Sequence, residues 1–230
     1  MPPQTSPPFS SSTHLNLSHW VPKTGAEGPG QRFALWVQGC AIRCAGCCNP
    51  EMFGFLPKQL LTVGDVMNMI RSAQSEYLIE GISCLGGEPF AQAEQLGLLA
   101  EAVQACGLSV MIFSGYTLED IRARQDPHAE RLLAHTDILV DGPYREELHT
   151  EDRRWIGSTN QRVHFLSDRY DPKDPCWKQK NSVEVFFDGK ELRITGFPKK
   201  EWREEVVRWR RQIEQARATG HLEQNKSRTP

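Results

Sequence analysis

The sequence has no long hydrophobic run and no strong excess of charge of either sign. No apolar stretch in its 230 residues approaches the roughly 20 residues that are needed to span a bilayer. The first residues lack the basic and apolar regions of a secretory signal. Lys and Arg number 27, Asp and Glu number 29, and the net charge is −2, so no global field draws the chain to nucleic acid or anionic lipid. We therefore expect a cytoplasmic protein with no direct nucleic-acid or membrane partner.

A disulfide framework is not indicated either. The seven cysteines are odd in number, and three of them are clustered, which favours a reducing compartment. Cys84, Cys106 and Cys176 are scattered and are most simply small buried hydrophobes or free thiols. The seven histidines share no regular spacing, so we assign none of them to a metal.

Three cysteines, Cys40, Cys44 and Cys47, form the most informative motif, with C-x3-C-x2-C spacing. Three thiolates can hold three irons of a 4Fe–4S cube and leave the fourth iron open, whereas electron-transfer clusters usually have four cysteine ligands. Structural zinc usually takes four ligands. The nearest fourth thiol, Cys48, is adjacent to Cys47, and we expect neighbouring side chains to point apart. The spacing favours an open cluster over zinc or a chance grouping of buried cysteines.

Strand and helix patterns alternate after the cysteines, which predicts an α/β fold with a parallel sheet. The apolar patterns predict strands at 15–21, 33–37, 81–85, 108–113 and 137–140 and helices at 66–77, 96–106, 117–124 and 129–135. Functional groups of parallel sheets lie on loops at the carboxyl ends of the strands. The unusual segments all fall there: the cysteine loop, Gly86-Gly87-Glu88-Pro89, Ser114-Gly115-Tyr116 and Asp141-Gly142-Pro143.

The pattern changes in the last third of the chain. Alternating apolar residues on both sides of Asp188-Gly189 predict a β-hairpin, and residues 201–218 predict an amphipathic helix. We predict a disordered lead at 1–13, a core at 14–168, a hairpin and helix extension at 169–222, and a disordered tail at 223–230. The extension either contacts a partner protein or covers the open side of the sheet, and the sequence leaves both options open.

The cysteine motif and the Gly-Gly-Glu-Pro segment together resemble the radical S-adenosylmethionine superfamily. Further segments resemble its small activating enzymes, such as those of anaerobic ribonucleoside-triphosphate reductase: residues 46–50, 113–119, 139–144 and 157–162. The likeness covers about residues 15–166 in order. Two features depart from the family: Ile156 stands where Arg is frequent, and about 60 residues follow the last matching segment.

The resemblance implies a partial (βα) barrel with parallel strands and an oxidoreductase activity. A 4Fe–4S cluster would reductively cleave S-adenosylmethionine to a 5′-deoxyadenosyl radical, which would take hydrogen from a glycine of a partner glycyl radical enzyme. A low-potential donor such as flavodoxin or ferredoxin would reduce the cluster. Alternatives are a radical enzyme that modifies another protein, a peptide or a small molecule, and a non-catalytic iron–sulfur protein.

The resemblance also implies roles for individual residues. Cys40, Cys44 and Cys47 would bind the cluster, and no catalytic side chain is expected beyond the cluster and its cofactor. The expected cofactor-binding residues are Gly46, Cys48, Gly86, Gly87, Glu88, Ser114 and Asp141. The Gly86-Gly87 pair would let the backbone approach the methionine end closely, and Glu88 would accept from its ammonium or brace the loop. A turn-forming role for Asp141, and structural hydrogen bonds for residues 160–162, are equally open.

Overall fold

The computed structural model describes residues 13–187, 192–197 and 208. Residues up to Phe197 form one compact unit. The turn at Asp188-Gly189, the tail at 223–230, and almost all of the lead and of the helix predicted over 201–218 lie outside the described residues.

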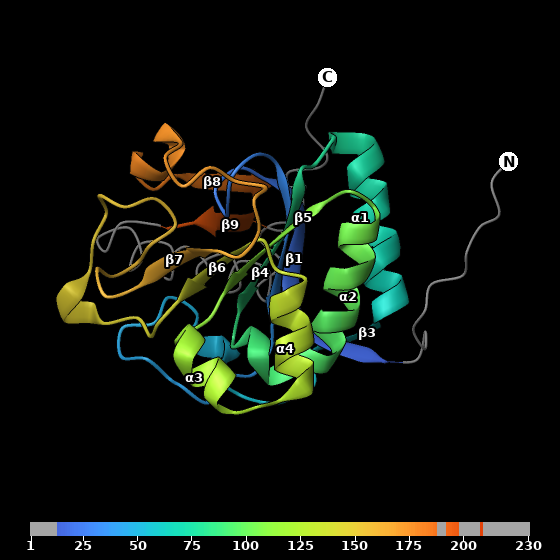
Figure 1. Cartoon of the computed structure of the whole chain (residues 1–230), viewed down its shortest axis with the longest axis horizontal. Coiled ribbons are helices and arrows are strands. Elements are labelled where there is room, and N and C mark those ends of the chain that lie inside the picture. The colour runs from blue at the N-terminus through green and yellow to red at the C-terminus, as the bar shows by residue number, and fades with distance from the viewer. Residues whose placement is uncertain (1–12, 188–191, 198–207, 209–230) are drawn as a thin grey trace, which may run out of the picture. The chain divides into compact units, whose positions relative to one another are not determined.

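A seven-stranded mixed sheet forms the centre of this unit (Figure 1). Its strands follow the order β3-β1-β2-β4-β5-β6-β7. They are β1 (His14–Thr24), β2 (Arg32–Val37), β3 (Gln59–Thr62), β4 (Gly81–Gly86), β5 (Ser109–Phe113), β6 (Ile138–Asp141) and β7 (Arg162–Phe165). The four central strands, β2, β4, β5 and β6, run parallel to one another. The predicted α/β fold with a parallel centre is therefore confirmed.

The outer strands differ from the all-parallel expectation. Strands β1, β3 and β7 each pair antiparallel with their neighbours, and the order of the strands leaves two free edges. The reason lies in the connections, because a parallel return needs a crossover that packs on the sheet. Only a short loop links β1 to β2, and the segment between β6 and β7 contains no α-helix. The sheet does not close, so a barrel is not confirmed.

Helices connect the central strands and cover one face of the sheet (Figure 1). They are α1 (Val63–Tyr77), α2 (Ala93–Ala105), α3 (Leu118–Ala123) and α4 (Pro127–Ala134), with 3-10 turns η1 (Pro50–Met52), η2 (Pro89–Gln92), η3 (Glu146–Leu148) and η4 (Pro175–Lys178). Thr62 and Thr117 begin α1 and α3 with reciprocal capping boxes, as their Asp partners three residues later suggest. No helix in the described ranges is long and apolar enough to cross a bilayer.

Side chains alternate between two apolar layers along the strands. On β5, Val110 and Ile112 join the large core beneath α1, α2 and α4, whereas Met111 and Phe113 face the opposite side. This second face is covered by the segments around Trp155 and Trp177, which follow β6 and β7. The sequence after residue 169 thus contributes to the core of the described unit.

The predicted hairpin is present as β8 (Val183–Phe187) and β9 (Leu192–Gly196), paired antiparallel. Polar bonds join it to the loop between β1 and β2. Glu184 accepts hydrogen bonds from the Thr24 hydroxyl at 2.7 Å and from the Gly25 amide at 3.1 Å. Glu27, which is 2% exposed, accepts from the Gly196 amide at 2.5 Å. Two carboxyl groups therefore help to fix the hairpin on this loop.

Burial of Glu27 predicts a measurable pH dependence. Burial raises the pKa of this carboxyl to about 8, and nearby Glu184 adds to the shift. The pKa of Glu27 is higher in the folded than in the unfolded protein, so its protonated form contributes to stability. This contribution is complete below the unfolded pKa and is lost as pH rises through about 8. The free energy of unfolding should fall between about pH 5 and pH 9, and Glu27→Gln should reduce this fall by on the order of a few kcal/mol.

Denaturant unfolding at both pH values measures this effect. Glu94→Gln, at an exposed position on α2, is the control and should keep the wild-type fall. An identical pH dependence in wild type and Glu27→Gln would show that Glu27 does not hold its proton in the folded protein.

Candidate active site

The segments with unusual sequence come together at the carboxyl ends of the parallel strands. The cysteine loop follows β2, the Gly-Gly-Glu-Pro segment follows β4, Ser114 follows β5, and Asp141 ends β6. Since these four strands are parallel neighbours, their carboxyl ends form one continuous edge. The structure thus brings together the regions that the sequence marked. Their places along the chain can be followed by colour in Figure 1.

The cysteine loop turns tightly between its thiols. Arg43 and Gly46 have φ values of 52° and 70°, which place both residues in the left-handed region. The Cys47 amide donates to the Cys44 carbonyl at 3.2 Å and closes the turn between these two cysteines. Cys40 is 7% exposed, and Cys44 and Cys47 are half-buried. Small residues and positive φ thus allow a short loop to present three thiols.

Local surroundings raise the pKa of the Cys44 and Cys47 thiols. Burial raises the pKa of Cys44, and the neighbouring Cys47 and Cys40 thiols add to the shift. A hydrogen bond with Cys48, followed by burial, raises the pKa of Cys47. The Cys47–Cys48 contact also corrects the expectation that these adjacent side chains point apart. Metal binding would displace the protons, because thiolates are the ligands.

The donor set suits an iron–sulfur cluster better than a single ion. Across the described ranges, no three His, Cys, Asp or Glu side chains converge closely enough to hold one metal ion. A cube binds each thiolate at a different iron, so its ligands stand farther apart than those of zinc. The Asn49 amide donates to the Cys47 sulfur at 3.4 Å, a bond of the kind that adjusts cluster potentials. Three thiols on one loop, one of them accepting an amide hydrogen bond, are donors of the kind that an iron–sulfur cluster takes.

The Gly-Gly-Glu-Pro segment is joined directly to the cysteine loop. The Gly87 amide donates to the Val37 carbonyl, and the Glu88 amide donates to the Gly39 carbonyl, both at 2.8 Å. A Cβ atom on Gly87 would overlap the Gly39 carbonyl oxygen and lie 2.7 Å from its carbon. Gly86 has φ of 105°, and its Cβ would lie 2.6 Å from the Val37 nitrogen. Both glycines are thus required by contacts within the protein itself.

Glu88 braces two loops. Its side chain, 1% exposed, accepts from the Phe90 amide, the Ser114 hydroxyl and the Gly115 amide, each at 2.9 Å. Burial raises the pKa of this carboxyl to about 7, although the three donors oppose the shift. Of the two roles expected for Glu88, the structure contains the brace between the loops after β4 and β5.

Asp141 is also engaged within the protein. Its carboxylate is fully buried and accepts from the Leu118 amide at 2.7 Å and from Arg162 at 2.6 and 3.1 Å. Arg162 continues to Glu119 on α3. Asn160 and Gln161 donate to the carbonyls of Pro143 and Gly142, respectively. This segment, left undecided by the sequence, thus ties α3, β6 and β7 together.

Arg162→Ala should destabilise the fold by about 2–3 kcal/mol, because it removes the arginine from the buried Asp141 carboxylate and leaves His164 Nε2, at 3.0 Å, as the remaining ionisable partner. Arg131→Ala is the matched control, since its pair with Glu101 lies at the surface and should contribute at most about 1 kcal/mol. Denaturant midpoints of the two variants give the comparison. Equal losses in both variants would contradict a special role for the buried pair.

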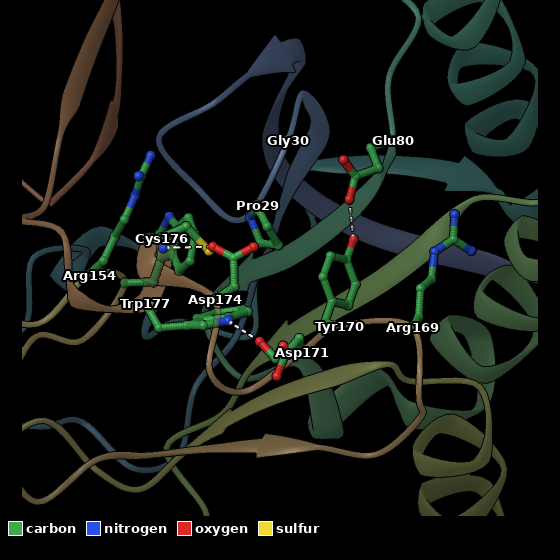
Figure 2. A pocket seen from close by; sticks show the side chains of 11 residues that line it. Pro29, Gly30, Glu80, Arg154, Arg169, Tyr170, Asp171, Asp174, Cys176 and Trp177 are labelled. Carbon is green, nitrogen blue, oxygen red and sulfur yellow. Dashed lines mark hydrogen bonds between the residues drawn. The ribbon is translucent and has the colours of Figure 1, made fainter.

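A cavity of about 330 Å³ lies at the opposite end of the parallel strands, near the amino ends of β2 and β4 (Figure 2). In Figure 2, Tyr170 donates to Glu80 at 2.6 Å, and the Trp177 ring nitrogen donates to the Asp171 carbonyl at 2.9 Å. The fully buried Arg32 binds Ser109 and Tyr170 beside it. Hydrogen bonds hold this end of the sheet together, and it lies apart from the loops that carry the cysteines.

Three polar side chains at the active edge escaped the sequence analysis. They are Asn16 on β1, Gln38 between β2 and Gly39, and Gln92 at the end of η2, whose side-chain amide bonds to the backbones of the other two residues. The one sequence signal was a polar residue, Gln38, directly between an apolar strand and the cysteine motif.

Three cysteines at C-x3-C-x2-C spacing, on a loop at the carboxyl ends of parallel strands, are the arrangement expected of an iron–sulfur protein. The profile of the family described as "4Fe-4S single cluster domain" matches residues 26–164. The chain is 29% identical over 168 residues to the anaerobic ribonucleoside-triphosphate reductase-activating protein of Enterobacteria phage T4, covering 71% of this chain and 99% of that protein.

Two other proteins give a similar result. The corresponding activating protein of Escherichia coli K12 is 28% identical over 66% of this chain and 99% of its own length. The pyruvate formate-lyase-activating enzyme of Staphylococcus aureus USA300 is 30% identical over 75% of this chain and 70% of its own. The solved structure of QueE from Escherichia coli aligns with a TM-score of 0.38 and 18% identity over 45% of this chain and 54% of that chain, too weakly to carry an argument.

The chain belongs to the 4Fe-4S single cluster domain family and, within it, to the radical S-adenosylmethionine activating enzymes. It is an enzyme whose cofactors are a 4Fe–4S cluster and S-adenosylmethionine. The predictions of superfamily, enzyme class and cofactors are thereby confirmed.

Proposed function

We propose that this chain activates a glycyl radical enzyme of the anaerobic ribonucleoside-triphosphate reductase type by removing hydrogen from one of its glycines. The observation that supports the proposal is a three-cysteine loop that is hydrogen-bonded to the Gly-Gly-Glu-Pro segment at the carboxyl ends of the parallel strands. Two relatives, of which this chain covers 99% of the length, are named as activating proteins of anaerobic ribonucleoside-triphosphate reductase. We also propose that the open sheet is the partial barrel of the radical enzymes.

In this proposal, Cys40, Cys44 and Cys47 hold the cluster. The backbone close to the cofactor comes from Gly46, Cys48, Gly86 and Gly87. The surrounding loops are held in place by Glu88, Ser114 and Asp141, whose side chains form hydrogen bonds within the protein. When bound, the reduced cluster and S-adenosylmethionine together supply a carbon radical able to take hydrogen from a C–H bond. The chain itself orients both groups and limits the access of water.

We further propose that a low-potential donor, flavodoxin or ferredoxin, reduces the cluster from the solvent side of the cysteine loop. Cys48 is exposed, and Cys44 and Cys47 are half-buried. A donor that docks at this loop would therefore come close to the ligands. The loop also lies at the surface where a partner chain must present its glycine.

Residues 14–168 form the catalytic core in this proposal, and 169–222 form its extension. The described part of the extension packs against the core through Tyr170, Trp177 and Phe197. This packing favours a covering role for residues 169–197, and any contact with a partner would then involve the remainder.

Anaerobic reconstitution tests the proposal. Protein loaded with iron and sulfide, then reduced, should convert S-adenosylmethionine to 5′-deoxyadenosine and methionine. Addition of an anaerobic ribonucleotide reductase should produce the doublet of a glycyl radical in its electron paramagnetic resonance spectrum. Cleavage of the cofactor without a glycyl radical in this enzyme or in pyruvate formate-lyase would favour a peptide or small-molecule substrate. Iron uptake without cleavage would favour a non-catalytic iron–sulfur protein.

A further inference from the structure

Three residues with side-chain amides lie where the cysteine loop begins and are linked through the side chain of Gln92. We call Asn16, Gln38 and Gln92 the amide clamp. The Gln92 amide nitrogen donates to the carbonyls of Asn16 at 2.9 Å and Gln38 at 3.0 Å, while its oxygen accepts from the Asn16 backbone amide at 2.8 Å. Gln92 thus bonds three backbone groups, of which the Asn16 carbonyl also accepts from the Gln38 amide at 2.8 Å.

The clamp also holds the far end of the cysteine loop. The Gln38 side chain, 3% exposed, donates to the Gly54 carbonyl at 2.6 Å. Asn16 donates to the Leu56 carbonyl at 3.0 Å and accepts from the Lys58 amide at 2.9 Å. The chain therefore leaves the clamp at Gln38, passes through the three cysteines, and returns to the same clamp at residues 54–58.

Gln92 connects this arrangement to the next loop. It ends η2, the turn that begins at Pro89 directly after the Gly-Gly-Glu segment. The Gly-Gly-Glu segment is already bonded to Val37 and Gly39 on one side of the cysteine loop. Gln92 adds a second connection on the other side of β2, through β1. Two separate attachments fix the rotation of one loop against the other, which a single attachment does not.

We infer that Gln92 is a positioning residue for the iron–sulfur cluster, setting the cysteine loop relative to the loop after β4 through the amide clamp. The inference rests on the proposed assignment of the cluster to Cys40, Cys44 and Cys47. Residues behind metal ligands commonly change metal affinity when they are replaced. The side-chain hydrogen bonds of Gln92 go to Asn16 and Gln38, so it acts on the cluster through the backbone that it holds.

Gln92→Leu removes all three hydrogen bonds while keeping a similar size. Gln104→Leu is its matched control, because Gln104 is a half-buried glutamine on α2 that joins His135 and Asp137 away from the cysteine loop. Both variants should lose similar thermal stability. Only Gln92→Leu should release iron faster, roughly tenfold or more, from anaerobically reconstituted protein mixed with an excess of a ferrous chelator.

Iron-free protein provides a readout that does not depend on the cluster. Cys40 is buried beside the clamp, so its alkylation by iodoacetamide, followed by peptide mass spectrometry, reports how firmly the loop is held. Alkylation of Cys40 should be faster in Gln92→Leu than in wild type or Gln104→Leu. Gln92→Glu keeps the acceptor for Asn16 but places a carboxylate against two carbonyls. Its iron release, relative to wild type at the same pH, should therefore slow as pH falls and the carboxylate gains a proton.

Each outcome decides between the two proposals. Wild-type protein that takes up no iron would overturn the proposed function. Wild-type protein that holds iron, with equal release rates and equal Cys40 alkylation in the Gln92 and Gln104 variants, would overturn the positioning role alone. A variant Gln92→Leu that does not fold leaves the decision to Gln92→Glu, in which pH-independent release at the wild-type rate would overturn the inference.

Discussion

Replacing Cys44 with alanine should lower the iron content of anaerobically reconstituted protein from about four atoms per chain to nearly none. The same loss is expected for Cys40 and Cys47, because a cube held by two thiolates exposes two irons. Cys48→Ser should retain the cluster, since its hydroxyl still fits beside Cys47 and Cys48 is not needed as a ligand. Iron and sulfide analysis with the visible absorption of the cluster gives the measurement.

Cys176→Ala is the control for the loss of one thiol far from the site, and it should keep full iron content. A cluster that survives Cys47→Ala but is lost in Cys48→Ser would mean that the third ligand is Cys48. Stoichiometric zinc without iron uptake in the wild type would reject the cluster assignment altogether.

Gly87→Ala should destabilise the protein by about 2–3 kcal/mol and reduce its capacity for iron as well. The added Cβ has no room beside the Gly39 backbone, and overpacking of this kind forces backbone shifts. The shift falls on the residue next to Cys40, so the cysteine loop must move. This expectation replaces the simpler one in which a side chain at Gly87 blocks only the cofactor.

Gly107→Ala separates steric overlap from backbone strain. Gly107 has φ of 79°, and a Cβ there meets nothing within 4 Å. Its replacement should cost about 1–2 kcal/mol through the left-handed conformation alone and leave iron uptake unchanged. Full iron content in Gly87→Ala, measured beside this control, would mean that the cysteine loop tolerates displacement of Gly39.

The sequence predicted the parts of the site that depend on local spacing. The three cysteines lie within one short loop, and the strands before Gly39 and Gly86 read correctly from their apolar runs. Because parallel strands place their ends together, the common edge of these loops also followed from the pattern. The capping threonines were visible for the same reason, since their partners stand three residues away.

The remaining features depend on residues that are distant in the sequence. The space beside Gly87 is filled by Gly39, and Glu88 finds its donors on the loop after β5. The amide clamp joins β1 to η2 through Gln92, and no periodic pattern marks such a pair. The antiparallel edges were not predicted, because alternating strand and helix patterns indicate parallel pairing and the connections that lack a helix leave no such pattern.

The two backbone bonds between Gly39 and Glu88 and between Val37 and Gly87 have a thermodynamic consequence. They make the cysteine loop and the Gly-Gly-Glu-Pro segment a single mechanical element, so ordering one also orders the other. Occupation of either half should therefore raise the affinity of the other half by the same factor, because coupling between two sites is reciprocal. At equilibrium, S-adenosylmethionine should raise the affinity of the chain for its cluster by the factor by which the cluster raises the affinity for S-adenosylmethionine.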